Sequence, residues 1–284
     1  MPASSIRPWR RAAPAAMLAV LLGVMLVSPA AAKSRWLRIC MDPDFHGASL
    51  AEACRKTIAD GGLSPRAEAA VYTNLGVALA QMDRHGDALT AYDKAAAADP
   101  GFVAVYLNRA LSRAARGQVR GALEDYDETV RLSPRDVGAR LGRGAFHLRR
   151  GLADQALADF DAAARIAPKD VDAVYNRGLA LMALDRPRDA AADFTRAMAL
   201  APTDAAARFE RGKARAAQGD RRGALADYAE ALRLRPEWPD PYIARGRLLE
   251  EQGDERAAGL AYRRAFELGA RDDWLRAKVQ ALGG

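Results

Sequence analysis

Residues 171–204 read VDAVYNRGLALMALDRPRDAAADFTRAMALAPTD, and this stretch decides the fold because six consecutive segments of the chain share its pattern. Pro202, near its end, belongs to a row of prolines that recur every 34 residues. A fixed period of this length is the signature of a repeat architecture. The repeats begin at residues 69, 103, 137, 171, 205 and 239. The prolines are Pro100, Pro134, Pro168, Pro202 and Pro236.

Three further positions predict two antiparallel helices in each repeat. The eighth and twentieth positions hold small residues, which allow two helices to approach closely. The twenty-fourth position is aromatic in all six repeats, and we expect its ring to fill the space toward the next helix pair. These residues are Gly76, Ala110, Gly144, Gly178, Gly212 and Gly246; Ala88, Ala122, Ala156, Ala190, Ala224 and Ala258; and Tyr92, Tyr126, Phe160, Phe194, Tyr228 and Tyr262.

The ends of the helices are marked as well. The fifteenth position holds glycine or aspartate, which tolerate the left-handed backbone that ends a helix. Pro187 falls in the expected first turn of a second helix, where its missing N–H costs nothing. The prolines at position thirty-two stop the second helices. The fifteenth residues are Asp83, Gly117, Gly151, Asp185, Gly219 and Gly253.

Over residues 69–272 this pattern resembles the tetratricopeptide repeat (TPR), a helix–turn–helix motif with the same period. The resemblance implies an all-α fold, a right-handed α-solenoid of six TPR repeats. Their bounds are 69–102, 103–136, 137–170, 171–204, 205–238 and 239–272. Residues 273–284 are expected to form a capping helix and tail that cover the last repeat. The helix is predicted there from residues that recur at helical spacing, which are Trp274, Leu275, Lys278, Val279 and Leu282.

Residues 33–68 precede the repeats and are expected to contain one helix, residues 49–62. Cys54 takes the place of the aromatic residue in this helix, and Cys40 is the second of the two cysteines. An oxidising compartment favours a disulfide between them, which would stabilise the fold by roughly 3 kcal/mol through loop closure. Two free thiols are the alternative. Leader, cysteine-bearing helix and repeats together resemble small exported bacterial TPR proteins.

Residues 1–32 have the composition of an export signal. Arg7, Arg10 and Arg11 form a basic start, AAMLAVLLGVMLV (15–27) is apolar, and SPAAA (28–32) ends in small residues. The apolar run is short for a span of roughly 20 residues, so we expect cleavage, with an uncleaved anchor as the alternative. Export would place the chain in the periplasm if its source is a Gram-negative bacterium.

The charge gives no indication of nucleic acid as a partner. Removal of the three leader arginines would lower the formal net charge from +7 to +4. This excess of positive charge is too small to predict a nucleic-acid surface. After cleavage we also expect no stable membrane span.

The seventh position of repeats two to six is arginine, on an otherwise apolar helix face. Aspartate stands at the twenty-third position of repeats two to five, and the first repeat lacks both. This pairing predicts a structural ladder of half-buried ion pairs, formed either within a repeat or between neighbours. The alternative is a cationic stripe for a phosphate or carboxylate ligand. The ladder residues are Arg109, Arg143, Arg177, Arg211 and Arg245, with Asp125, Asp159, Asp193 and Asp227; Arg109 or Arg245 would end it unpaired.

In TPR proteins the first helices line a concave groove, and the resemblance implies such a groove here. An apolar groove of this extent predicts a protein partner, bound as an apolar peptide or amphipathic helix. Alternatively these residues pack repeat against repeat, or a terminus of the same chain fills the groove. The lysine–asparagine clamp that some TPR proteins use for a C-terminal carboxylate is missing. The predicted groove residues are Leu107, Leu111, Leu141, Leu148, Arg149, Tyr175, Leu179, Met182, Phe209, Lys213 and Arg247.

We expect no enzyme, no cofactor and no metal site. The repeats occupy 69–272 of the stretch 33–284 that remains after cleavage, which leaves no room for a catalytic domain. No phosphate-binding loop or nucleophile motif occurs, and His85 and His147 lack companions at metal-ligand spacing. Asp42, Asp44 and His46 leave a cation sensor open as an alternative. The expected function is a scaffold or adaptor in a cell-envelope assembly, with a periplasmic holdase-type chaperone as the main alternative.

Overall fold

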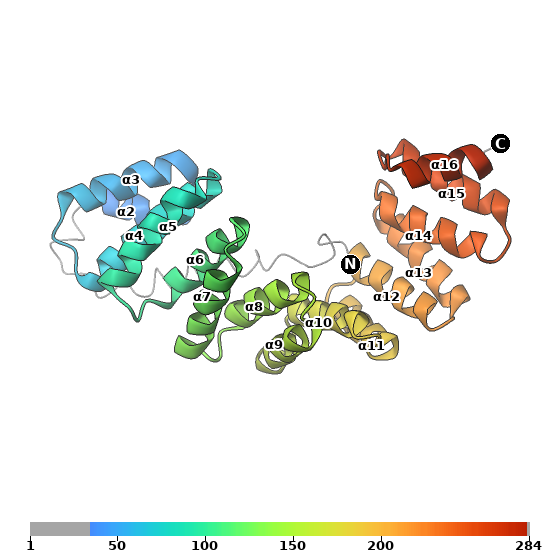
Figure 1. Ribbon diagram of the computed structural model, residues 1–284, viewed down its shortest axis with the longest axis horizontal. Helices are drawn as coiled ribbons and strands as arrows, with labels where there is room; N and C mark the ends of the chain where they lie inside the picture. Colours follow the sequence, from blue (N-terminus) through green and yellow to red (C-terminus); the bar gives the residue numbers. More distant parts are fainter. Residues whose placement is uncertain (1–34, 283–284) are drawn as a thin grey trace. The chain divides into compact units, whose positions relative to one another are not determined.

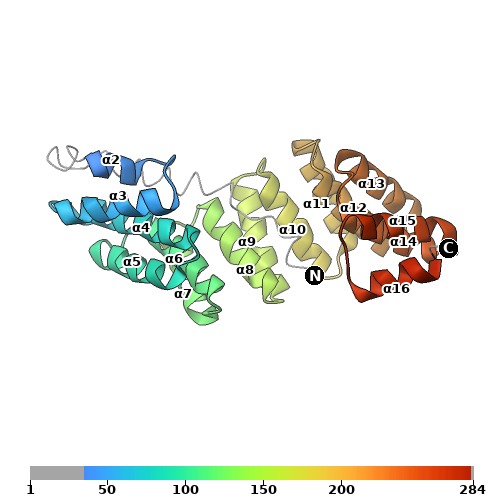
Figure 2. The same ribbon diagram turned by 90° about the horizontal axis from the view of Figure 1, so that it is seen from above.

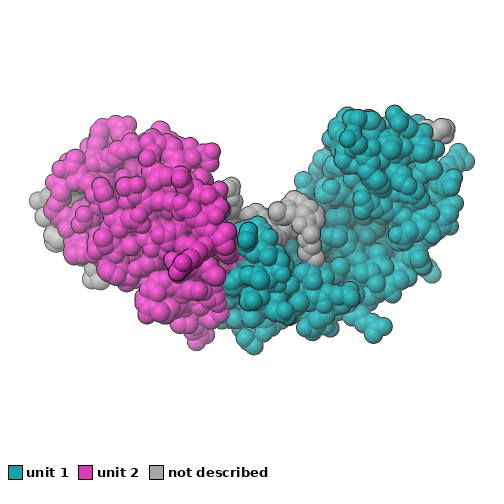
Figure 3. Space-filling model, in the orientation of Figure 1, with its two compact units in different colours: residues 1–7, 147–284 teal, residues 8–146 magenta. Residues whose placement is uncertain are grey.

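The computed structural model describes residues 35–282, and the regular structure in that range is entirely helical (Figure 1). The all-α fold is therefore confirmed. The described residues form two compact units, 35–146 and 147–282, and the boundary falls within α8 (Figure 3). The helices are α2 (Arg35–Met41), α3 (Gly47–Asp60), α4 (Pro65–Gln81), α5 (His85–Ala98), α6 (Val103–Ala115), α7 (Val119–Leu132), α8 (Val137–Arg149), α9 (Ala153–Ile166), α10 (Val171–Ala183), α11 (Pro187–Leu200), α12 (Ala205–Ala217), α13 (Arg221–Leu234), α14 (Pro239–Glu250), α15 (Glu255–Glu267) and α16 (Asp273–Leu282).

Consecutive helices form antiparallel pairs within each compact unit, the arrangement typical of a TPR solenoid (Figure 2). The closest pairs are α4 with α5 and α6 with α7 in one unit, and α10 with α11, α12 with α13 and α14 with α15 in the other. The helices α6, α8, α10, α12 and α14 begin at residues 103, 137, 171, 205 and 239, the predicted repeat starts. Helix α4, the first helix of the first repeat, begins at Pro65, before the predicted start at residue 69. It does so because Ser64 caps it and Pro65 fits its first turn.

The turn inside each repeat has the left-handed backbone that its fifteenth residue predicts. Asp83 and Asp185 adopt φ values of 59° and 55°, and glycines occupy the other four turns at 69° to 80°. In repeats one to five the second helix ends two residues before a proline, as α11 does at Leu200 before Pro202. Local sequence therefore fixes both ends of the helix pair.

The aromatic ring at position twenty-four packs against the eighth residue of its own repeat. A Cβ atom on Gly178 would lie 2.8 Å from Cε1 of Phe194, and one on Gly246 would lie 2.4 Å from Cε1 of Tyr262. The ring thus fills the gap between the two helices of its own repeat. Some rings also reach the helix that follows, as expected: Tyr126 lies 5.6 Å from Phe146 and Tyr262 lies 5.3 Å from Trp274, between ring centroids. Small residues are needed at position eight because the ring edge occupies the space of a side chain.

Between residue 35 and the first repeat the structure describes two helices, α2 and α3, where we expected one in residues 33–68. Helix α2 has only seven residues, too few to be stable alone, and its periodicity is therefore hard to recognise. Burial of Leu37, Cys40 and Met41 against α3 and α4 holds it in place. The expected disulfide between Cys40 and Cys54 is present and buried.

This disulfide takes the place of the glycine–aromatic contact of the repeats. Cys54 is the eighth residue of α3, and Tyr92 is likewise the eighth residue of α5. Tyr92 packs on Gly76 of α4, whereas Cys54 bonds to Cys40 of α2. The amide nitrogen of Asn74 also donates to the carbonyl oxygen of Cys40 at 2.8 Å. The pair α2–α3 is therefore a shortened helix pair closed by a covalent bond.

At the other end, α16 packs against α15 in the place that the spacing of residues 273–284 predicts. Leu275 is fully buried, and the Trp274 ring meets Tyr262 edge to face at 5.3 Å between centroids. Lys278 forms an ion pair with Glu250 of α14. These contacts cover the apolar face of the last repeat.

The expected export signal, residues 1–32, lies outside the described residues. Within residues 35–282, no helix is both long enough and apolar enough to cross a membrane. The last two residues of the expected capping segment, 283–284, also lie outside the described range.

Candidate functional site

Six of the eleven predicted groove residues are buried, with exposed fractions between 0% and 8%. These six side chains contribute to packing, so they form no apolar wall open to solvent. Small residues beside them let the helices approach closely enough to cover them. Leu111, Met182 and Lys213 are half-buried, and Arg149 and Arg247 are exposed. The buried six are Leu107, Leu141, Leu148, Tyr175, Leu179 and Phe209.

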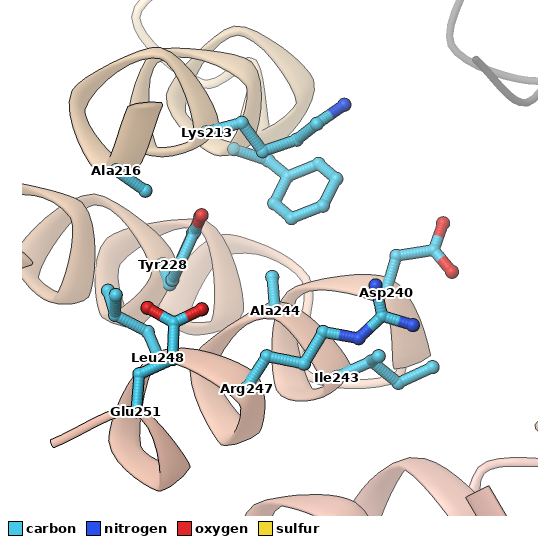
Figure 4. Close-up of a pocket in the computed structure, with 10 residues that line it drawn as sticks. Lys213, Ala216, Tyr228, Asp240, Ile243, Ala244, Arg247, Leu248 and Glu251 are labelled. Carbon is cyan, nitrogen blue, oxygen red and sulfur yellow. The ribbon is translucent and has the colours of Figure 1, made fainter. Parts of the chain in front are cut away.

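Three of the predicted groove residues line one cavity of about 600 Å³ in the C-terminal compact unit (Figure 4). They are Phe209 and Lys213 on α12 and Arg247 on α14. Figure 4 shows Lys213 and Arg247 on different helices that border the cavity. The other lining residues are Ala216, Tyr228, Asp240, Ile243, Ala244, Leu248 and Glu251.

The cavity has an aromatic and aliphatic floor. The Phe209 ring packs edge to face on Trp238 at 4.8 Å and contacts Tyr228 at 5.7 Å between centroids. Burial raises the pKa of Tyr228, and the charges of Glu210, Asp227 and Glu251 raise it further. Its phenol therefore stays protonated, and the floor is uncharged at neutral pH.

The rim of the cavity carries charges of both signs. Lys213 Nζ lies 2.7 Å from Oε2 of the buried Glu210 and 5.5 Å from the centre of the Phe209 ring. The Arg247 guanidinium lies over the Trp274 ring at 4.5 Å. Asp240 and Glu251 add carboxylates from α14 and the turn that follows it. An apolar group can enter this cavity while charged neighbours of either sign meet the rim.

Three of the seventh-position arginines, Arg109, Arg177 and Arg211, pair with the aspartate of their own repeat. The carboxylates are nearly buried, with exposed fractions of 3% for Asp125, 6% for Asp193 and 4% for Asp227. Each is held by two nitrogen atoms of one guanidinium, the strong bidentate geometry. The shortest distances are 2.7 Å from Arg109 to Asp125, 2.6 Å from Arg177 to Asp193 and 2.6 Å from Arg211 to Asp227.

The seventh-position arginines of repeats two to five also reach back to the preceding repeat, through a row of residues that sequence reasoning missed. Arg109 lies 2.8 Å from Asp93, Arg143 lies 2.7 Å from Asp127, and Arg177 lies 3.0 Å from Asp161. Arg211 donates to the hydroxyl of Thr195 at 3.2 Å. These partners occupy position twenty-five, and their recurrence with the repeat period was a signal that could have revealed them. Of the two registers left open for the position-twenty-three aspartates, the structure therefore shows the one within a repeat, and the contacts between neighbours go to this second row instead.

These contacts commit the arginines to the scaffold. The hydrogen bonds that Arg177 donates to Asp193 raise the pKa of Arg177 most. Burial lowers this pKa, and the charge of Asp193 and the contact with Asp161 raise it further. A guanidinium held by two carboxylates has few donors left for a ligand. The geometry therefore favours the structural ladder over a cationic stripe.

Arg245 ends the ladder. Its two partner positions are Ala229 in the fifth repeat and Ala261 in the sixth. Its Nε atom is buried and has no hydrogen-bond partner among the described residues. The guanidinium lies 5.6 Å from the centre of the Tyr242 ring. Arg109, the other candidate for an unpaired end, has two carboxylate partners.

The loop with Asp42, Asp44 and His46 forms no metal centre in the structure. The backbone N–H of Asp44 donates to Oδ1 of Asp42 at 3.0 Å, and the His46 carbonyl accepts from the Ser49 hydroxyl. Across residues 35–282, no group of three or more histidine, cysteine or acidic side chains is placed to hold a metal ion. The loop geometry is that of a turn leading into α3.

Antiparallel helix pairs that recur with one fixed period, with Arg–Asp contacts within and between repeats, define a helical-repeat protein. Family models described as "Tetratricopeptide repeat" match residues 69–102, 107–171 and 175–236. These ranges cover more than half of the chain, which therefore belongs to the tetratricopeptide repeat family. Such repeats imply a protein–protein interaction scaffold, and the proteins that contain them are typically non-catalytic. No curated protein matches the chain at a significant level.

Solved structures share this fold at low sequence identity. A tetratricopeptide repeat protein from Parabacteroides merdae is 20% identical with a TM-score of 0.62, and the match covers 83% of this chain and 92% of that one. YrrB, described as a TPR protein with an unusual peptide-binding site, is 23% identical with a TM-score of 0.54, covering 68% and 99%. MamA from Desulfovibrio magneticus RS-1 is 20% identical with a TM-score of 0.55, covering 59% and 94%. These likenesses show the fold alone.

Proposed function

We propose that this protein is a non-catalytic scaffold of the cell envelope that binds a partner polypeptide at the cavity between α12 and α14. The observation that supports this is the cavity itself, about 600 Å³ in volume, with Phe209 in its floor and Lys213 and Arg247 at its rim. Cavities of roughly 300 to 1,000 Å³ with an apolar lining and a few polar groups are the usual ligand sites of proteins.

The chemistry of the cavity favours a peptide with an apolar anchor. A leucine or aromatic side chain would pack against Phe209, Ile243 and Leu248, where burial of its apolar surface supplies most of the affinity. Neighbouring charged residues of the peptide would meet Lys213 and Arg247 or the two rim carboxylates. A peptide site on a fold of this kind has a precedent in YrrB, whose structure is described as having one.

The envelope location is proposed from two features of the sequence. Residues 1–32 have the composition of a cleaved export signal. The Cys40–Cys54 disulfide fits an oxidising compartment such as the periplasm. A protein secreted through this signal would meet its partner outside the cytoplasm.

A holdase-type chaperone using the same groove is the less favoured function. A chaperone for unfolded chains needs broad apolar surface, and the six buried groove residues supply none. Among the described residues, the large hydrophobic side chains that are exposed are Leu152, Leu260 and Trp274. A bounded cavity such as that between α12 and α14 fits a defined peptide better than a range of unfolded clients.

A peptide-library selection with a cavity-filling variant tests the proposal. Ala244→Trp places an indole in the cavity, and Ala229→Trp is the matched control on the exposed side of α13. We expect selection on the unmodified chain to enrich peptides that share one apolar anchor, and Ala244→Trp to weaken them at least about tenfold, or about 1.4 kcal/mol. Ala229→Trp should leave their affinity unchanged.

Two results would count against the proposal. One is that selection on the folded chain enriches no peptide more than a control selection on the denatured chain does. The other is that Ala244→Trp, checked for native helicity by circular dichroism, binds the enriched peptides as well as the unmodified chain does. Suppression of aggregation of unrelated denatured proteins by the unmodified chain, lost in Ala244→Trp, would instead support the holdase.

A further inference from the structure

The position-eleven residue of the first helix distinguishes the fourth repeat from the second and fifth. In the second repeat, Arg113 donates to Oδ2 of Asp125 at 2.8 Å and to the Gly121 carbonyl at 3.1 Å. In the fifth repeat, Arg215 makes the same two contacts, at 2.9 Å to Asp227 and 3.4 Å to the Gly223 carbonyl. The buried aspartate of each of these repeats thus receives a second guanidinium.

The fourth repeat lacks that guanidinium. Leu181 stands at position eleven, and Asp189 replaces the glycine at position nineteen. Asp193 has an exposed fraction of only 6%, and within residues 35–282 the cation that contacts it is Arg177. A position that holds arginine twice in this chain is therefore occupied by an apolar side chain beside an additional carboxylate.

A cavity of about 550 Å³ lies at this place, bordered by α9, α10 and α11. Its apolar lining includes Leu157, Ala158 and Leu181, and its acidic lining consists of Asp154, Asp161, Asp189 and Asp193.

The two arginines of this lining are already paired. Arg177 holds Asp161 and Asp193, and Arg186 lies 2.6 Å from Asp189. Asp161 is also paired with Arg165, at 2.9 Å, so four carboxylates facing three guanidiniums leave a formal charge of −1 at the cavity. The site is therefore both hollow and negative where the second and fifth repeats place a cation.

We propose that this cavity, which we term the repeat-four acidic pocket, binds the guanidinium of an arginine side chain from a partner polypeptide. The incoming group would occupy the place that Arg113 and Arg215 fill in their own repeats and donate to Asp193 and Asp189. Its aliphatic stem would pack against Leu157 and Leu181.

Arginine fits this pocket better than lysine does. A planar guanidinium can donate to two carboxylates at once in fixed directions, as Arg109 and Arg177 of this chain already do. An ammonium group is a compact charge that retains its water more strongly. The proposal is independent of the α12–α14 cavity, since no residue lines both sites.

Nuclear magnetic resonance on the full chain tests the pocket, with Nα-acetyl-arginine methylamide as the probe and the methyl groups of Leu157, Ala158 and Ala192 as reporters. We expect these methyl signals to shift with a Kd on the order of millimolar, the range of a single small group. The citrulline analogue, which has the same shape and no charge, should shift them at least tenfold less. The lysine analogue should bind more weakly than the arginine probe.

The variant Leu181→Arg fills the pocket from within, as in the second and fifth repeats, and should weaken probe binding at least tenfold. Leu181→Met is the matched control and should bind as the unmodified chain does. Asp189→Asn, at an exposed position, tests the charge without touching the core and should weaken binding several-fold.

Equal shifts with the arginine and citrulline probes would overturn the proposal. So would unchanged binding by a natively folded Leu181→Arg variant, or by Asp189→Asn if Leu181→Arg does not fold. Binding that survives both substitutions would mean that the probe sits elsewhere.

Discussion

The Phe194 ring lies so close to Gly178 that a Cβ atom on the glycine would come within 2.8 Å of its Cε1 atom. We expect Gly178→Ala to lower the free energy of unfolding by about 1–3 kcal/mol, because the added methyl forces the ring or a helix to move. Urea denaturation followed by circular dichroism measures the change.

Gly86→Ala is the control for this substitution. Gly86 lies in the first turn of α5, where the nearest atom to an added Cβ is the flexible end of Arg116 at 3.0 Å. Alanine favours helices more than glycine does, so we expect a gain of up to about 1 kcal/mol. A loss of stability in Gly86→Ala as large as in Gly178→Ala would show that ring contact is not the cause.

Asp185 adopts a φ of 55°, in a turn where four other repeats have glycine. The left-handed conformation costs a residue with a Cβ more than it costs glycine. Glycine relieves this strain, but it also increases the conformational entropy of the unfolded chain. We expect the relief to be the larger effect, so that Asp185→Gly raises the free energy of unfolding by about 0.5–1 kcal/mol. Thermal unfolding measures this, and Gly219→Ala should have the opposite effect. An unchanged melting temperature in both variants would contradict the assignment.

The period, the turns and the helix ends were predictable because each depends on residues within one repeat. Helix starts at residues 103 and 171 follow from spacing alone. The in-repeat pairing of Arg177 with Asp193 was visible for the same reason, since both recur together. The contact of Arg177 with Asp161 was harder to predict, because it depends on the distance between neighbouring repeats.

Burial of the groove residues was beyond prediction from the sequence. Tyr175 and Phe209 occupy positions that face a groove in related repeats, yet their exposed fractions are 2% and 7%. Their accessibility depends on how tightly one helix pair is stacked on the next, which no single repeat encodes. The repeat-four acidic pocket was missed because it is defined by Leu181, an ordinary helix residue until it is compared with Arg113 and Arg215 in space.

Arg211 and Arg245 have the same position in the repeat and opposite surroundings. Arg211 holds the buried Asp227, so Arg211→Leu should cost about 3 kcal/mol by leaving that carboxylate with fewer cations. Arg245 has a buried Nε atom without a hydrogen-bond partner among the described residues, so Arg245→Leu should be neutral or stabilising by about 1 kcal/mol. Urea denaturation of both variants measures the difference. Equal losses would show that Arg245 also has a carboxylate partner.

The attachment of α16 should depend on pH through Glu250. Hydrogen bonds from Lys278, and then from Tyr262, lower the pKa of the Glu250 carboxyl below its ordinary value of 4.5. Because the folded pKa is lowered, the stabilisation is complete above about pH 4.5 and is lost as the pH falls through the folded pKa. Hydrogen exchange of α16 amides between pH 7 and 3, corrected for the intrinsic pH dependence, should show this loosening.

The variant Glu250→Gln removes the titrating group and should give α16 a stability that no longer changes in this pH range. Glu251→Gln, at the neighbouring exposed position, is the control and should keep the pH dependence. Persistence of the acid effect in Glu250→Gln would assign it to another carboxyl group.

The Cys40–Cys54 bond should stabilise the N-terminal helix pair and little else. Replacement of both cysteines by alanine removes a closed loop with a sequence separation of 14 and should cost about 3 kcal/mol by the chain-entropy account. We expect the amides of α2 and α3 to exchange faster, because the short α2 would then depend on packing and on the bond from Asn74 to Cys40. Amides of α12 and α13, in the other compact unit, should exchange as before.

A reductant offers the matched test, since it should speed exchange in α2 and α3 of the unmodified chain once the buried bond is opened. The double alanine variant has no bond to open, so the reductant should leave its exchange unchanged. Equal protection of α2 with and without the disulfide would mean that packing alone holds this helix. In that case the covalent bond would not be the counterpart of the glycine–aromatic contact between Gly76 and Tyr92.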